Sequence, residues 1–297
     1  MKELGRLITA MVTPFDEAGN VDYEQAGKLA QALLGSGSDG ILLAGTTGES
    51  PTLRQEEELR LFREVKQVVG NRGTIIAGTG SNSTAEALDT TKKAEKIGVD
   101  ACLLVVPYYN KPPQYGLYEH FKTIAENTNL PCILYNVPSR HVVNLSVETV
   151  VKLSQIDNII GIKEASGNLN QIAQVVNNTA ADFFVWSGND TDTLHVLTVG
   201  GYGIVSVAGH LVGKQIKEMI NSFLAGDVLK STKIHNHLLT LVNTLFIVSN
   251  PIPVKYAVNQ VGFRVGKPRL PLTEPDEKSA TIIRDTLKNY QIDLTIK

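Results

Sequence analysis

The sequence predicts an α/β protein that folds as a (β/α)8 TIM barrel with a C-terminal helical extension. Apolar, β-branched runs alternate with helical patterns up to about residue 213, and eight such strand–helix units can be counted. Short turns that contain Gly or Asn join the units, a pattern that favours a parallel sheet. Eight units close a barrel of the usual size. An open, doubly wound sheet remains an alternative, because periodicity does not reveal closure.

Each predicted strand is a short apolar run, and each helix follows it after a turn. The predicted strands are 7–12, 40–45, 74–78, 101–106, 132–136, a run within 158–167, 183–190 and 203–209. The helices that follow the first seven are expected at 22–34, 54–69, from 84 onward, 118–126, 147–154, 169–176 and 193–199. Gly35 and Gly70 end the first two helices. The run Ser83-Thr84-Ala85-Glu86 predicts a capping box that opens the third.

The strand–helix alternation stops at about residue 214, which divides the chain into a barrel at 1–213 and a C-terminal helical region at 214–297. Helical patterns in the second part cover 214–224, 230–248 and 279–290, with a shorter one at 254–261. We expect this region to pack on the barrel, where it contributes to a subunit interface or covers the site.

Composition and charge narrow the class of protein. The 297 residues include 28 basic and 30 acidic side chains, a net charge of −2. No run of like charges is present, so nothing calls for a nucleic acid or an anionic membrane as partner. The first residues lack a signal pattern, and no apolar run is long enough to cross a bilayer. Cys102 and Cys132 lie in apolar runs and are expected to be buried, reduced thiols. Together these features predict a cytoplasmic protein.

Lys163 lies in an apolar run, which is a poor place for a surface charge. Period-two alternation puts Lys163 on the face of Ile159 and Gly161, and Glu164 on the opposite face. Burial disfavours an ammonium, so the pKa of Lys163 is expected to fall and a neutral amine to become accessible near pH 7. Such an amine can form a Schiff base with a ketone. The alternative is a structural ion pair between Lys163 and a glutamate.

The ends of the predicted strands carry other reactive side chains, and in a barrel the working residues lie at these ends. They are Thr13, Thr46, Thr47, Tyr108, Tyr109, Tyr135, Arg140, Lys163, Ser187, Gly188 and Ser206. Taken singly, each has a structural explanation, but together they predict a site for a small keto acid. The Gly45–Ser50 loop can bring backbone N–H groups close to a carboxylate or a phosphate, and a plain tight turn is the alternative.

No cofactor or metal site is predicted. Gly78–Ser83 lacks the last glycine of a dinucleotide fingerprint, and Gly209–Lys214 is one residue short of a phosphate loop. His235 and His237 are two residues apart on a predicted helix and do not share a face. No His, Cys or carboxylate spacing is typical of zinc. The sequence therefore argues against metal-dependent aldol chemistry.

Four motifs closely resemble a known family: GTTGES at 45–50, PYYNKP at 107–112, YNVPSR at 135–140 and GIKEASGN at 161–168. The family is that of the pyruvate-dependent class I aldolases, which includes dihydrodipicolinate synthases and N-acetylneuraminate lyases. The resemblance covers essentially the whole chain. GTTGES and the lysine motif are shared by the wider family, whereas PYYNKP together with Arg140 favours the dihydrodipicolinate synthase branch.

The resemblance implies a lyase that condenses pyruvate with L-aspartate 4-semialdehyde, giving 4-hydroxy-tetrahydrodipicolinate in diaminopimelate and lysine biosynthesis. Lys163 is then the Schiff-base lysine, and Tyr135 transfers protons. Thr46 links Tyr135 to Tyr109, which reaches in from a neighbouring subunit of a homotetramer. The implied substrate-binding residues are Thr47 for the pyruvate carboxylate, Val205 lining that pocket, and Arg140 near Gly188 for the semialdehyde carboxylate.

Some members of the family are inhibited by lysine at a cleft in the dimer interface. The positions that match this cleft are Ser50, Asn82, Glu86 and Tyr108. The stretch from Gln55 to Glu58 lacks the histidines of many regulated members, so lysine feedback is a hypothesis here.

Two other readings stay open at this point. One is a sibling aldolase that acts on a 2-keto-3-deoxy sugar acid or on N-acetylneuraminate. The other is a keto-acid-binding barrel without turnover.

Overall fold

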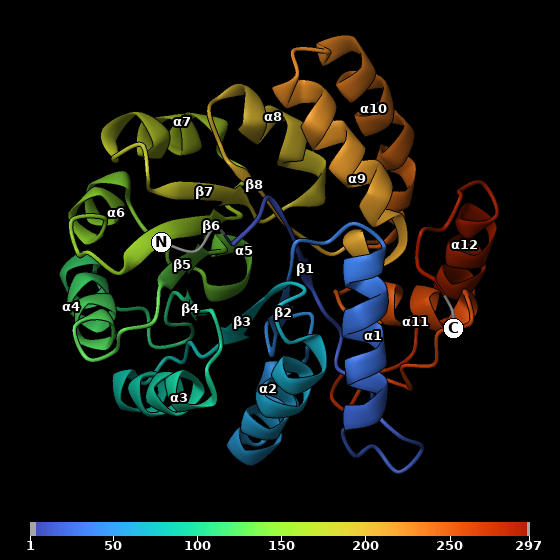
Figure 1. Ribbon diagram of the computed structural model, residues 1–297, viewed down its shortest axis with the longest axis horizontal. Coiled ribbons are helices and arrows are strands. Elements are labelled where there is room, and N and C mark those ends of the chain that lie inside the picture. The colour runs from blue at the N-terminus through green and yellow to red at the C-terminus, as the bar shows by residue number, and fades with distance from the viewer. Residues whose placement is uncertain (1–3, 296–297) are drawn as a thin grey trace. The chain divides into compact units, whose positions relative to one another are not determined.

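The protein is described by a computed structural model that covers residues 4–295. Its parallel strands follow one another in chain order around a closed barrel (Figure 1). The predicted (β/α)8 barrel is therefore confirmed, and the open sheet is wrong. The strands are β1 Leu7–Ala10, β2 Gly40–Leu43, β3 Thr74–Gly78, β4 Ala101–Val105, β5 Cys132–Asn136, β6 Ile159–Glu164, β7 Phe184–Ser187 and β8 Gly203–Ser206.

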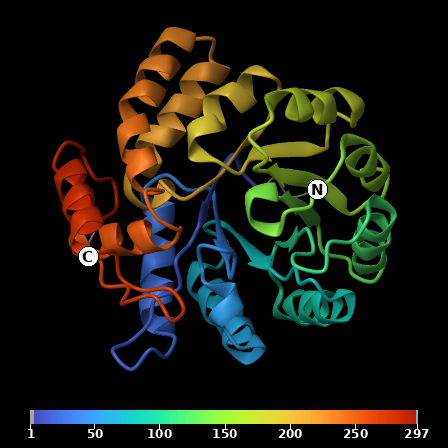
Figure 2. The ribbon, with the colours of Figure 1, turned by 180° about the vertical axis from the view of Figure 1, so that it is seen from behind.

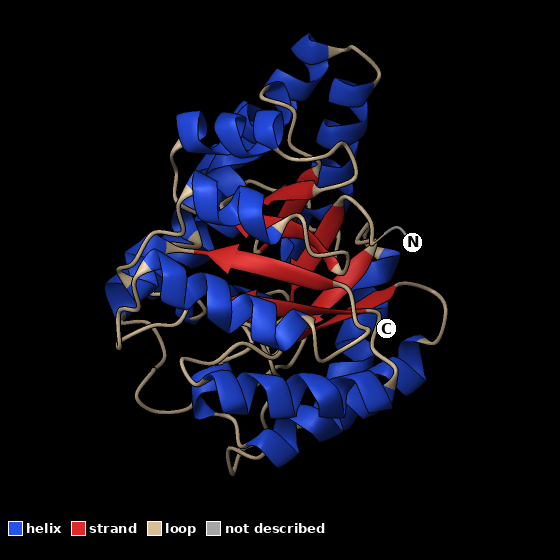
Figure 3. Ribbon diagram, turned by 90° about the vertical axis from the view of Figure 1, so that its left-hand side faces the viewer, coloured by secondary structure: helices blue, strands red, loops and turns tan. Residues whose placement is uncertain are grey.

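The chain forms two compact units: residues 75–205, and the remainder, which runs up to Thr74 and resumes at Ser206. The predicted division at residue 213 remains a prediction. In the 75–205 unit, helices cover the outer side of the strands (Figure 3). These helices are α3 Thr84–Ile97, α4 Gln114–Ala125, α5 Pro138–His141, α6 Val147–Leu153, α7 Leu169–Asn178 and α8 Thr193–Thr198, the last preceded by a 3₁₀ turn at Asp190–Asp192.

The other unit combines the first two strand–helix units with the C-terminal helices. In it, α9 and α10 lie side by side (Figure 2), and α11 packs against α12. Its helices are α1 Tyr23–Gly35, a 3₁₀ turn at Ser50–Thr52, α2 Gln55–Val69, α9 Gly209–Leu224, α10 Val228–Thr244, α11 Ile252–Gln260 and α12 Glu277–Leu287. Among residues 4–295, no helix is both long and apolar enough to cross a membrane.

The capping box predicted at Ser83 forms only in part. The Ser83 hydroxyl accepts a hydrogen bond from the Glu86 amide and so caps α3. The Glu86 carboxylate does not return to the Ser83 N–H, because it accepts instead from the Ser81 hydroxyl at 2.9 Å. Ser81 also accepts from the Ser83 N–H. The reciprocal half of the predicted box is therefore wrong.

Several helix boundaries differ from the predicted ones. Helix α4 begins at Gln114 rather than at 118, with Pro113 as its N-cap, a position where a missing N–H costs nothing. Helix α9 begins at Gly209 rather than at 214, where the Gly209 N–H donates to the Ser206 hydroxyl at 2.7 Å. The two cysteines are buried free thiols, as predicted, and their sulfur atoms lie 3.5 Å apart.

His210 fastens the end of β1 to the start of α9. Its Nε2 accepts from the Val12 N–H at 3.1 Å, and its Nδ1 lies 2.8 Å from the Val207 carbonyl. Nε2 therefore carries the lone pair and Nδ1 the proton. Burial lowers the pKa of His210 from 6.5 to about 4, with the Val207 carbonyl opposing the shift.

We expect acid to weaken the fold through His210. Because the folded pKa lies below the unfolded one, the unfolded chain takes up the proton first, and stability is lost as the pH falls from 6.5 toward 4. For this residue the loss between pH 7 and pH 4.5 is about 2 kcal/mol. Urea unfolding at both pH values checks this, with the neutral substitution His210→Gln as comparison. An equally steep pH dependence in that variant would contradict the assignment.

Candidate active site

Lys163 lies in β6, a strand whose residues are all buried, and is only 6% exposed. In the parallel register it is the partner of Tyr135 on β5 and of Trp186 on β7. Its ammonium nitrogen lies 4.2 Å from the centre of the Tyr135 ring, and Tyr135 is equally buried. Within residues 4–295, no carboxylate lies at ion-pair distance from Lys163. The amine thus has an aromatic neighbour rather than an acidic partner.

Glu164 lies on the opposite face of β6 and has its own partners. Its carboxylate accepts from the Asn136 amide at 3.0 and 3.1 Å, from the Ser166 N–H at 2.8 Å and from Gln171 at 3.2 Å. Burial raises the pKa of Glu164, and these donors oppose the shift. The carboxylate anchors the loop after β6 to its neighbours. The alternative of an ion pair between Lys163 and a glutamate is therefore not what the structure contains.

Arg140 lies on α5, a single turn that the sequence did not predict. The Val137 N–H at the start of this turn donates to Nε2 of His141 at its end, at 2.6 Å, and this hydrogen bond stabilises the turn. Burial lowers the pKa of His141 to about 4, so the ring is neutral and can accept. Arg140 itself is exposed.

Gly188 directly follows β7, and Val205 lies on β8. A Cβ at position 188 would lie 2.5 Å from the Ala165 Cβ, so only glycine fits there. The Gly188 N–H donates to the Glu164 carbonyl at 2.7 Å, which ties the end of β7 to that of β6. Val205 is buried in β8.

The GTTGES loop lies in the other unit and is held in an uncommon conformation. Ala44, directly before the loop, and Glu49 within it have φ values of 48° and 58°, in the left-handed region that residues other than glycine rarely adopt. Thr13 donates from its hydroxyl to the Gly48 carbonyl at 2.6 Å. Thr47 is buried, whereas Thr46 is partly exposed. The loop is therefore a shaped turn with buried anchors.

A buried ion pair that no local sequence pattern predicts holds this loop. Lys255 on α11 donates to the Glu49 carboxylate at 2.7 Å and to the Thr13 carbonyl at 2.9 Å. Both side chains of the pair are fully buried. Burial lowers the pKa of Lys255 to about 8, although the Glu49 charge opposes the shift. The Arg269 N–H completes the pair by donating to the second Glu49 oxygen at 2.8 Å.

The residues that match the lysine cleft have local partners in their own units. The Ser50 hydroxyl donates to Glu58 at 2.7 Å, and burial raises the pKa of Glu58 to about 7. The Asn82 amide donates to the Tyr108 carbonyl at 3.1 Å. Tyr109 is 89% exposed with a φ of 72°, so its ring stands away from its own unit.

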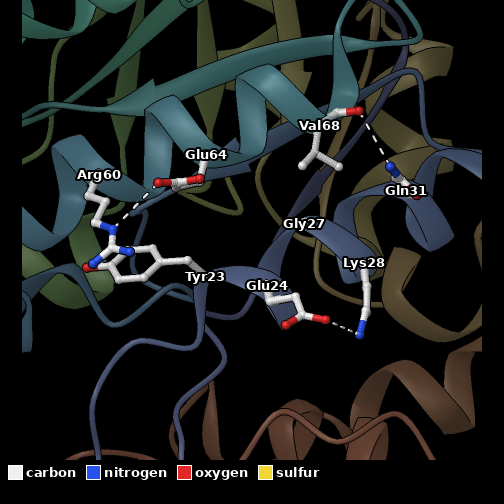
Figure 4. Close-up of a pocket in the computed structure, with 8 residues that line it drawn as sticks. All are labelled: Tyr23, Glu24, Gly27, Lys28, Gln31, Arg60, Glu64 and Val68. Atoms are coloured by element: carbon white, nitrogen blue, oxygen red, sulfur yellow. Dashed lines mark hydrogen bonds and ion pairs between the residues drawn. The ribbon is translucent and has the colours of Figure 1, made fainter.

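A groove of about 480 Å³ between α1 and α2 is lined by exposed charged side chains, unlike the buried surroundings of Lys163 (Figure 4). Its charges pair with each other on the surface, Lys28 with Glu24 at 2.6 Å and Arg60 with Glu64 at 3.6 Å. The Arg60 guanidinium also lies over the Tyr23 ring at 4.1 Å. No charge in this groove is buried, so it offers no activated group. In the described part of the chain, no three His, Cys, Asp or Glu side chains are placed to hold a metal ion.

A lysine and a tyrosine buried together on neighbouring strands of such a barrel define the class: a (β/α)8-barrel enzyme. Comparison with known proteins makes the class specific. The model of the dihydrodipicolinate synthetase family matches residues 3–290, and the chain belongs to this family. A relative from Dehalococcoides mccartyi, named 4-hydroxy-tetrahydrodipicolinate synthase, is 67% identical over the full length of both chains.

Solved structures of relatives agree with the fold. A dihydrodipicolinate synthase from Bacillus anthracis is 48% identical with a TM-score of 0.96, over 98% of this chain and 99% of that one. The enzyme from Cyanidioschyzon merolae, solved with lysine bound, is 47% identical with a TM-score of 0.95, over 96% and 98%.

Proposed function

We propose that this chain condenses pyruvate with L-aspartate 4-semialdehyde through a Schiff base on Lys163, and so forms 4-hydroxy-tetrahydrodipicolinate for diaminopimelate and lysine biosynthesis. The full-length relatives that carry the name of this synthase support the reaction. The observation that carries the assignment to Lys163 is its burial beside Tyr135, with no carboxylate partner among residues 4–295. The cytoplasmic location stays a prediction.

The proposed chemistry follows from an amine in this setting. The Lys163 nitrogen attacks C2 of pyruvate, and water leaves to give an imine. The imine withdraws electrons, so the pyruvate methyl group loses a proton and the resulting enamine attacks the aldehyde carbon. The amino group of the second substrate then displaces Lys163 and closes the ring. Tyr135 donates and accepts these protons. Thr46 of the same chain and Tyr109 of a neighbouring subunit form the proton relay.

Substrate binding is assigned to groups that suit two carboxylates. Thr47 and nearby backbone amides bind the pyruvate carboxylate, and Val205 lines that pocket. Arg140 binds the semialdehyde carboxylate near Gly188, since a guanidinium matches a carboxylate with two parallel hydrogen bonds. The direct test is a coupled assay with both substrates. Turnover of a 2-keto-3-deoxy sugar acid or N-acetylneuraminate, without turnover of the semialdehyde, would instead favour the sibling aldolases.

Replacing Arg140 by alanine is expected to separate the two substrates. We expect kcat/KM for the semialdehyde to fall about 100-fold, because a charge-assisted hydrogen bond to its carboxylate is lost. Borohydride trapping of pyruvate on the enzyme should change by less than about threefold, since this residue does not serve the first step. The Arg140→Lys variant, which keeps the charge, is the control. Equal losses in both measurements would contradict the role.

A homotetramer is part of the proposal. The exposed ring of Tyr109 supports it, because a side chain that reaches into a neighbouring subunit has to stand away from its own. Sedimentation at micromolar chain concentration measures the oligomeric state, and a monomer that turns over at full rate would remove Tyr109 from the relay.

Free lysine is proposed as a feedback inhibitor at the cleft formed by Ser50, Asn82, Glu86 and Tyr108. The lysine bound to the Cyanidioschyzon merolae relative supports this. We expect initial rates to fall as lysine is raised into the millimolar range, and Glu86→Ala to weaken the inhibition because a carboxylate that can pair with an amine is removed. A flat response at millimolar lysine would refute it.

A further inference from the structure

A side chain from the C-terminal region contacts the GTTGES loop at its centre. Asn250, two residues before the start of α11, donates from its side-chain amide to the Thr47 hydroxyl oxygen at 2.9 Å. Both side chains are buried, with Thr47 only 3% exposed. The two residues are far apart in sequence, so the contact depends on the fold of the C-terminal region.

This contact fixes the direction of the Thr47 hydroxyl hydrogen. A hydroxyl group has one hydrogen to donate, and its oxygen can accept as well. An amide nitrogen only donates, so toward Asn250 the Thr47 oxygen has to accept. Its own hydrogen then points elsewhere, and no acceptor for it occurs among residues 4–295. The hydroxyl is therefore oriented as a donor with an open position.

The two residues that follow Thr47 are also held, in part by the same region of the chain. Lys255 binds Glu49 and the Thr13 carbonyl, and Thr13 in turn binds the Gly48 carbonyl. The Arg269 N–H donates to the second Glu49 oxygen. These contacts restrict the conformation of the loop. The orientation that Asn250 imposes on the Thr47 hydroxyl hydrogen is therefore a fixed one.

We propose that Asn250 is a positioning residue that presents the Thr47 hydroxyl as a donor to the carboxylate of the keto acid, through the 2.9 Å contact between the two side chains. The proposal rests on the proposed function in one respect, the assignment of Thr47 to the pyruvate carboxylate. A donor already oriented before binding raises affinity because no rearrangement is needed when the substrate arrives.

The test is a double-substitution cycle on pyruvate affinity, measured by calorimetry on the full-length protein. Asn250→Ala should weaken pyruvate binding about 3- to 10-fold, the loss of one oriented neutral hydrogen bond. Asn250→Asp should weaken it more, about 30-fold, because a carboxylate accepts the Thr47 hydrogen and turns it away from the substrate. In a Thr47→Val background, Asn250→Ala should have no further effect, because the hydroxyl it orients is gone.

A control separates positioning from a loss of structure. Asn259 also joins parts of the C-terminal region, donating to the Gly266 carbonyl at 2.9 Å and accepting from the Val265 N–H at 2.8 Å. It does not contact Thr47, so Asn259→Ala should leave pyruvate affinity unchanged even if it lowers stability. If it raises the dissociation constant as much as Asn250→Ala does, a general disturbance explains both and the proposal falls.

The remaining outcomes are also decisive. Independent, multiplicative effects of Asn250→Ala and Thr47→Val would overturn the positioning role. Borohydride trapping at Lys163 is measured on the same samples and reports separately on the proposed function. A wild-type protein that binds pyruvate without being trapped refutes the Schiff base, yet the cycle still decides the role of Asn250. Normal trapping with unchanged affinity in both Asn250 variants refutes only the positioning role.

Discussion

Replacing Lys163 by methionine is expected to lower kcat about 10⁴-fold or more, with the fold intact. The amine forms the covalent imine through which every later step of the proposed reaction passes, and loss of a nucleophile is among the largest single effects in catalysis. Methionine preserves the apolar volume next to Tyr135, so the barrel has no reason to unfold. The coupled assay with both substrates gives the rate, and the thermal midpoint checks the fold.

Two controls accompany this prediction. Lys163→Arg keeps a positive charge but cannot form an imine at neutral pH, so it should be as inactive as the methionine variant. Lys152→Met removes an exposed lysine from α6 and should retain full activity. Substantial turnover by either Lys163 variant would remove this residue from the chemistry.

Replacing Lys255 by methionine is expected to lower the free energy of unfolding by about 3–5 kcal/mol, the second of the two largest effects. The substitution leaves the Glu49 carboxylate buried without its cation, and of its hydrogen-bond donors among the described residues the Arg269 N–H remains. An uncompensated buried charge is costly, whereas a buried pair replaced as a whole often is not. The double variant Lys255→Met with Glu49→Gln should therefore recover much of the loss.

Urea unfolding at pH 7 measures both variants. The control is Lys267→Met, which breaks the exposed pair between Lys267 and Glu274, whose side chains are 76% and 49% exposed. An exposed pair contributes less than about 1 kcal/mol. If Lys255→Met costs no more than the control, the buried pair is not what holds the GTTGES loop.

The same reasoning from sequence applies to Lys163 and to Lys255, yet the two lysines differ in the structure. Lys163 was singled out because it lies in an apolar run, and Lys255 lies in the equally apolar run IPVKYAV. Both lysine side chains are buried. Only the fold brings Glu49 to Lys255, and in the part of the chain that the structure describes it brings no acidic partner to Lys163. Local pattern therefore finds buried amines, but the long-range contacts decide which of them is paired.

The barrel itself was predictable because its signal is local. Strand and helix periods alternate in order, and strands that pair in chain order need no further information. The face occupied by Lys163 also followed from period-two alternation. The roles of Asn250 and Arg269 did not, because each contacts the GTTGES loop from about 200 residues away in sequence. No short-range pattern encodes such contacts.

Local competition among side chains explains the smaller errors. Ser83 and Glu86 have the correct spacing for a capping box, but the Glu86 carboxylate accepts a hydrogen bond from the Ser81 hydroxyl instead. The sequence predicts no helix directly after Pro138, yet the turn α5 forms there, and the ring of His141 stabilises it from within by accepting the Val137 N–H. In each case a neighbour that the pattern does not weigh supplies the competing hydrogen bond.

Reduction with borohydride in the presence of pyruvate, followed by peptide mass mapping, measures the central claim most directly. The reduced adduct should appear on the peptide that contains Lys163, at close to one per chain, and should be absent from Lys163→Met. An intact protein that binds pyruvate but gives no adduct, or carries it on another lysine such as Lys255, would contradict the account.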